Sequence, residues 1–150
     1  MIIDRDERWT FGHALHVEDP TIGTFIRNTL YSKITLNPTE SNWVLASVPT
    51  PNVTKGWKVG AVALRYTIRG GVGVIDKIGL RDGDQTVYSF EGLTLGPIAD
   101  WQSVGLSLPP SNFQYGLGVS IHVNYPVVQP LGPTEFLFAS VGLGFVLESP

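Results

Sequence analysis

Three histidines are the side chains in this sequence best suited to bind a metal or carry a proton. His13 and His16 lie three residues apart in a predicted strand, residues 10–18, and an odd spacing sends two side chains to opposite faces. We therefore expect His13 to pack inside and His16 to face solvent. A zinc site would require His16, Glu18 and His122 to converge from separate strands. The spacing thus predicts no metal site, and nothing in the sequence indicates a cofactor.

Asp76 is the carboxylate with the most unusual position. It lies in phase with Ile78 and Leu80, which should point into a core, and a buried carboxylate must be paired or neutral. Three interpretations follow. Asp76 forms a structural ion pair with Arg65 or Arg69, it is a catalytic acid, or a β-bulge shifts the strand so that Asp76 faces outward.

The sequence offers no set of residues for nucleophilic catalysis. It lacks cysteine, and no Gly-x-Ser-x-Gly motif is present between a strand and a helix. Asp82-Gly83-Asp84 lies between two strand-like segments and is typical of a hairpin turn, because a calcium loop needs more oxygen ligands. We nominate no catalytic residue, and a hydrolase built on Asp76 or His122 is the least favoured function.

Four tryptophans border turn-rich segments, where an aromatic ring can stack against a sugar. Trp43 is flanked by Val44 and Leu45, so we expect it to fill one end of the core. Trp57 and Trp101 follow Gly56 and Asp100 and are freer to face solvent. These two residues are therefore the candidate ligand-binding side chains.

Alternating apolar and polar residues predict the elements that hold these side chains. The clearest case is 117–125, where Val119, Ile121 and Val123 alternate with polar residues. About nine strands are expected, at residues 10–18, 22–36, 42–48, 61–69, 72–81, 86–90, 101–108, 117–125 and 135–147. Proline and glycine turn signals separate them, including Pro109-Pro110. The pattern predicts one all-β domain over residues 1–150, an antiparallel two-sheet sandwich of jelly-roll or Greek-key type, with a closed barrel as the alternative.

Composition excludes several classes of partner. Ten Lys and Arg against 13 Asp and Glu give a net charge of −3, without the basic stripe that nucleic acid binding requires. No apolar run is long enough to span a membrane, and charges occupy the N-terminal residues 4–8 where a signal peptide needs an apolar core. These features favour a cytoplasmic protein that binds neither nucleic acid nor membrane.

Short runs of glycine, proline and aromatic residues resemble a widespread family of small bacterial single-domain β proteins that is catalogued as a domain of unknown function. The matching runs are residues 9–12, 17–20, 42–43, 49–51, 90–93, 116–120 and 138–142. The resemblance covers nearly the whole chain. It implies a β-sandwich and supplies no activity, catalytic residue or binding residue.

Two functions remain. The first is a non-catalytic structural or interaction module that self-associates as a homo-oligomer. It is favoured by the low charge and by Phe136-Leu137-Phe138-Ala139, a strand that is apolar on both faces and must be covered twice. The alternative is a lectin-like sandwich that binds a carbohydrate or small ligand through Trp57 or Trp101.

Overall fold

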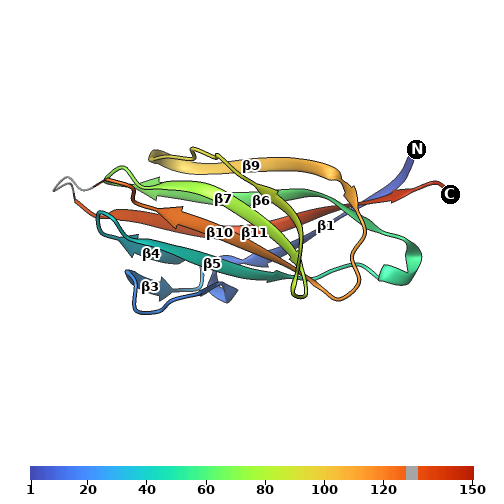
Figure 1. The fold of residues 1–150 in the computed structure, drawn as a ribbon, viewed down its shortest axis with the longest axis horizontal. Coiled ribbons are helices and arrows are strands. Elements are labelled where there is room, and N and C mark those ends of the chain that lie inside the picture. The colour runs from blue at the N-terminus through green and yellow to red at the C-terminus, as the bar shows by residue number, and fades with distance from the viewer. Residues whose placement is uncertain (128–131) are drawn as a thin grey trace.

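The computed structural model describes residues 1–127 and 132–150, which are mostly β-strand (Figure 1). The strands are β1 (Ile2–Phe11), β2 (His16–Val17), β3 (Thr24–Arg27), β4 (Ser32–Leu36), β5 (Ser41–Val48), β6 (Lys58–Arg69), β7 (Val74–Asp82), β8 (Gln85–Phe90), β9 (Ile98–Ser111), β10 (Leu117–Asn124) and β11 (Thr134–Glu148). Two turns of 3-10 helix, η1 (Gly12–Ala14) and η2 (Val53–Lys55), also occur. Within the described residues, no helix has the length and apolar character needed to cross a membrane.

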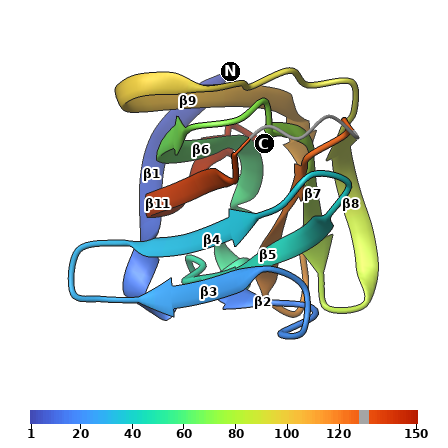
Figure 2. The ribbon, with the colours of Figure 1, turned by 90° about the vertical axis from the view of Figure 1, so that its left-hand side faces the viewer.

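The strands form two antiparallel sheets, and Figure 2 shows the molecule from one end. The six-stranded sheet has the order β3-β4-β11-β6-β9, and β1 pairs with the C-terminal part of β11. The five-stranded sheet has the order β2-β5-β10-β7-β8. The chain passes repeatedly from one sheet to the other, as in a jelly roll. The predicted two-sheet sandwich is confirmed, and the barrel alternative is wrong.

The core lies between the sheets and follows the alternation seen in the sequence. In β10 the residues facing inward are at most 3% exposed, and the residues between them are partly exposed on the outer face. The inward set of β10 is Leu117, Val119, Ile121 and Val123, and that of β6 includes Val62, Leu64, Tyr66 and Ile68. The alternation in the sequence predicted that Val119, Ile121 and Val123 share one face, and this face is the buried one. The opposite face of β10 is thereby left free for polar side chains.

The N-terminal part of the chain differs from the prediction. Residues 4–8 are all charged and were not expected to form a strand, yet they belong to β1, which pairs with β11. The predicted strand 10–18 is interrupted at η1 because Gly12 lies against the backbone of β4 and β11, where any side chain would clash. His13 lies in η1 and is exposed, so the prediction that it packs inside is wrong. His16 is exposed, as predicted.

Two further boundaries differ from the prediction. The described residues form eleven strands instead of nine, because the predicted strands 10–18 and 22–36 are each divided in two. The segment 22–36 is split by a turn in which the Asn28 side-chain oxygen accepts the backbone N–H groups of Leu30 and Tyr31, each at 2.8 Å. Pro109 and Pro110 lie inside β9 instead of forming a turn. A strand at the edge of a sheet tolerates proline because its outward N–H groups need no partner.

Strand β11 is apolar on both faces at residues 136–138, which was the sequence-based argument for a second subunit. All three side chains are at most 2% exposed within the single chain. Leu137, on the outer face, pairs in register with Lys33 of β4 and Thr67 of β6. Because one chain already covers both faces of this segment, the structure does not support that argument for a homo-oligomer.

Ile121→Asp tests the register of β10. Ile121 is 0% exposed, so an aspartate there would place an unpaired charge in the core and lower the free energy of unfolding by several kcal/mol. Thermal melting followed by circular dichroism measures the loss. Ser47→Asp, at an exposed position of neighbouring β5, is the matched control and should melt close to the parent protein. An unchanged melting temperature for Ile121→Asp would show that the register is wrong.

Candidate functional site

The outer face of the five-stranded sheet contains a hollow of about 490 Å³, which we call the groove. Its floor is one row of residues paired across four strands. Leu45 of β5 pairs with Ser120 of β10, Ser120 pairs with Gly79 of β7, and Gly79 pairs with Ser89 of β8. Gly79 has no side chain and Ser120 a short one, so the sheet is hollowed at its centre.

Two large side chains border this row from opposite sides. Trp43 lies two residues before Leu45 on β5, and Arg81 lies two residues after Gly79 on β7. Because strand residues two apart share a face, both side chains point outward with the floor. Glu18, just after β2, also lines the groove. The groove therefore combines an aromatic ring, a cation, a carboxylate and hydroxyl groups.

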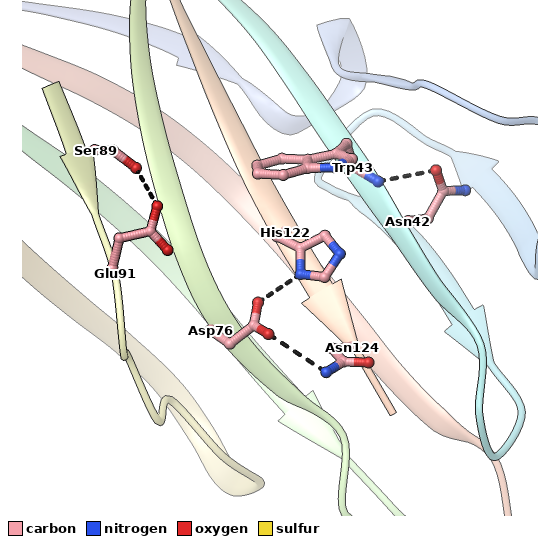
Figure 3. A network of polar contacts seen from close by, with 7 residues as sticks. All are labelled: Asn42, Trp43, Asp76, Ser89, Glu91, His122 and Asn124. Carbon is pink, nitrogen blue, oxygen red and sulfur yellow. Dashed lines mark hydrogen bonds and ion pairs between the residues drawn. The ribbon is translucent and has the colours of Figure 1, made fainter. Parts of the chain in front are cut away.

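The ring of Trp43 is supported from below by a chain of polar contacts (Figure 3). The imidazole of His122 packs against the indole, with ring centroids 4.7 Å apart and planes inclined by 50°. His122 Nδ1 lies 2.6 Å from Asp76 Oδ1, within hydrogen-bonding distance. Asn124 Nδ2 donates to Asp76 Oδ2 at 3.3 Å. Three side chains from two strands thus fix the orientation of Trp43.

A β-bulge in β7 brings Asp76 to this position. His122 pairs with Lys77 and Val123 with Ile75, so Asp76 is an extra residue with no partner in β10. The bulge turns Asp76 to the outer face while Ile75 and Ile78 remain buried. Of the three interpretations of Asp76, the bulge is confirmed. The expected ion pair with Arg65 or Arg69 is wrong because Asp76 pairs with His122.

The expectation that Trp43 fills the core is also wrong. Val44 points inward and is 0% exposed, so alternation places Trp43 on the outer face, where it is half-buried. Its ring also borders a second hollow of about 440 Å³ beside the segment from Asp19 to Ile22. Asn42 holds that segment, since its Nδ2 donates to the carbonyl oxygens of Asp19 and Ile22. Trp43 therefore stands between two depressions.

The structure does not bring Trp57 and Trp101 to the groove. Trp57 follows η2 and packs against the core beside the six-stranded sheet. Trp101 belongs to β9, where its ring lies 6.2 Å from that of Tyr31 and 6.0 Å from the guanidinium carbon of Arg65. Their proposed role in ligand binding stays a prediction. The signal that could have found the groove was the polar face of β10, since that face includes Ser120, which lines the groove, and His122, which packs against Trp43.

The histidines do not form a metal site. In residues 1–127 and 132–150, no group of three or more His, Cys, Asp or Glu side chains is placed to hold a metal ion. Glu18 and His122 both border the hollow beside Asp19, while His16 borders a different one. The three candidate zinc ligands therefore do not converge.

Several solved structures share this fold at low sequence identity. A family 29 carbohydrate-binding module variant in complex with mannohexaose has a TM-score of 0.55 and 11% identity, over 94% of this chain and 93% of that one. A second variant, in complex with cellulohexaose, has a TM-score of 0.54 and 10% identity, over 94% and 92%. A family 29 module from Piromyces equi has a TM-score of 0.52 and 10% identity, over 94% and 91%.

At such identities the likeness establishes the β-sandwich fold alone. No protein-family model matches the chain, and no curated protein matches it. The resemblance of the sequence to a bacterial domain of unknown function therefore remains a prediction.

Asp82 is the last residue of β7 and follows the groove-lining residue Arg81. Its carboxylate accepts the backbone N–H groups of Gln114 at 2.7 Å, Tyr115 at 2.8 Å and Gly116 at 3.1 Å. Burial raises the pKa of Asp82, but the three hydrogen bonds together outweigh burial and leave the pKa below its usual value. The ionised carboxylate therefore holds the loop that precedes β10.

Asp82→Asn should lower stability at pH 7 by about 1–3 kcal/mol, because one carboxylate oxygen is replaced by an NH₂ group that cannot accept the N–H of Gln114. Since the folded pKa lies below the unfolded one, the carboxylate's contribution is full above the unfolded value of about 3.9 and is lost as the pH falls through the folded pKa. Thermal melting should show a gap between variant and parent at pH 7 that narrows towards pH 3. A gap independent of pH would contradict this assignment.

Proposed function

We propose that this protein is a non-catalytic carbohydrate-binding domain that holds a saccharide in the groove of the five-stranded sheet. The observation that carries the proposal is the indole of Trp43, which His122 and Asp76 hold in place at the border of the groove, beside its polar side chains. A pyranose ring has an apolar C–H face and a rim of hydroxyl groups. It needs an aromatic surface and nearby hydrogen-bonding groups together, and the groove supplies both.

The dimensions and polar groups of the groove fit such a ligand. Its volume of about 490 Å³ lies within the range of small-molecule sites. Ser120 supplies a hydroxyl group that can donate or accept. The Ser89 hydroxyl donates to Glu91 Oε1 at 2.7 Å and can accept from a ligand, and the Glu18 carboxylate also accepts. The groove crosses the strands and is open along its length, so it can hold one stretch of a longer saccharide chain.

The fold comparisons support the same class of function. The similar structures include modules solved with mannohexaose and with cellulohexaose. Their sugars are not transferred to this chain, because residues that select a sugar change faster than the sandwich that holds them. The lectin-like alternative drawn from the sequence is thus better supported than the self-associating module, and the proposal assigns binding to the groove instead of to Trp57 and Trp101.

The hydrolase interpretation gains little from the pairing of His122 and Asp76. Among the described residues, the polar side-chain contact of His122 is Asp76, and its ring otherwise packs on Trp43. A His–Asp pair can act as a general base on a hydroxyl, a thiol or a water molecule at the second imidazole nitrogen, and in the part of the chain that the structure describes no side-chain hydroxyl is hydrogen-bonded to His122. The pair serves here to position an aromatic ring.

Trp43→Ala tests the proposal. Affinity electrophoresis and titration calorimetry against soluble glucans, mannans, galactans, xylans and uronate polymers should first identify a saccharide that binds. The variant should then lose at least about fivefold in affinity, because stacking on a large aromatic ring is worth on the order of 1 kcal/mol or more. Trp57→Ala and Trp101→Ala are the matched controls. Binding that survives Trp43→Ala but fails in either control would place the site where the sequence first indicated.

A further inference from the structure

Arg81 lies where the groove meets a third hollow on the same sheet face. This hollow has a volume of about 560 Å³ and shares Leu45, Ser120 and Arg81 with the groove. The two depressions are therefore continuous across Arg81. His16, which is exposed on β2, lines the third hollow as well. We call it the basic hollow, because its lining includes a cation and a histidine and no Asp or Glu.

The charge of Arg81 is not neutralised by a neighbouring carboxylate. One guanidinium nitrogen, Nη2, donates to the backbone carbonyl of Asp84 at 2.6 Å. Within the described residues, the ion pairs closer than 4.0 Å do not include Arg81. The carboxylate of adjacent Asp82 is buried and accepts three backbone N–H groups. The guanidinium of Arg81 is thus held by one hydrogen bond, and its other N–H groups are free to bind a ligand. It is an exposed positive charge on a protein whose net charge is −3.

We propose that the ligand of this face is an anionic saccharide, whose carboxylate or sulfate group is bound by Arg81 within the basic hollow. The planar guanidinium can donate two parallel hydrogen bonds to either group. His16 supplies a further nitrogen at the edge of the same hollow. The inference rests on the proposed function, since it assigns a chemical class to the saccharide that stacks on Trp43.

The register of the sheet sets the distance between the stacked unit and the charged unit. Trp43 pairs with His122, whereas Arg81 pairs with Gly118, four residues along β10 and two strands away from β5. At about 3.3 Å per residue and 4.8 Å per strand, the two Cα atoms lie roughly 16 Å apart. This span exceeds one sugar ring. The charged group therefore belongs to a different unit of the saccharide from the one on Trp43.

The carboxylates nearby agree with this orientation. Glu18 lines the groove and the hollow beside Asp19, but it does not line the basic hollow. An anionic unit beside Glu18 would be repelled, whereas the same unit beside Arg81 is attracted. The face thus favours a neutral unit near Trp43 and Glu18, and an anionic unit near Arg81.

Arg81→Gln is the decisive variant, because it removes the charge from an exposed residue and keeps a side chain of similar length. Lys77→Gln is the matched control, since Lys77 is an exposed cation on the same strand that does not line either hollow. Affinities are measured by titration calorimetry at low and high salt. The probes are homogalacturonan in its de-esterified and methyl-esterified forms, alginate, glucuronoxylan and carrageenan, together with neutral glucomannan, galactan and xylan.

The parent protein should bind at least one anionic probe about tenfold more tightly than the neutral polymers, and Arg81→Gln should remove that advantage. Uronate and sulfate probes separate the two sources of charge. Arg81→Gln should weaken binding of the anionic probe more than binding of neutral polymers, which also pass Arg81 in the groove, and Lys77→Gln should retain the preference. An equal loss in Lys77→Gln, or anionic binding unaffected by Arg81→Gln, overturns the inference. Neutral binding that depends on Trp43 would still uphold the proposed function, whereas failure of all probes overturns both.

Discussion

Strand β11 is the element on which the two sheets depend. It runs for 15 residues through the middle of the six-stranded sheet, pairing with β6 on one side and with β4 and then β1 on the other. Its inward side chains Phe136, Phe138 and Phe145 are among the largest fully buried groups of the core. The six-stranded sheet covers one side of the core, and the inner face of the five-stranded sheet covers the other. The outer face of the five-stranded sheet therefore does not contribute to the core. This outer face is free to carry polar and aromatic groups.

The bulge at Asp76 places a carboxylate on this outer face, where it forms polar contacts with His122 and Asn124. In a regular strand, Asp76 would lie in the apolar layer with Ile78, and the imidazole of His122 would have no carboxylate beside it. The extra residue places Asp76 next to His122 at the cost of one unpaired position in the ladder. Bulges commonly occur next to functional sites because they redirect a side chain without changing the fold. The position of Asp76 follows directly from this single irregularity, whereas His122 and Asn124 lie on the outer face because β10 alternates regularly.

The sandwich could be predicted from the sequence because it follows from the alternation of residues, most clearly in β6 and β10. The site could be predicted only in part. The polar face of β10 was recognised, but alternation alone cannot place Asp76, whose direction depends on a bulge that no local residue type marks. Trp43 was assigned to the core because its neighbours are apolar, although they occupy opposite faces of β5. Pairing between distant strands, which brings Arg81 and Trp43 to the same groove, has no signature in the sequence.

The sheet edges have a consequence for the behaviour of many copies of the protein held close together. An edge strand offers unpaired backbone groups to any other extended chain, and long exposed edges favour aggregation. Here β1 carries five consecutive charged residues, residues 4–8, and the other margin of the same sheet, β9, contains Pro109 and Pro110. Each makes the addition of a foreign strand costly, one by charge and the other by removing N–H donors. Copies of the protein held close together would therefore stay separate at these margins and would not join into continuous sheets.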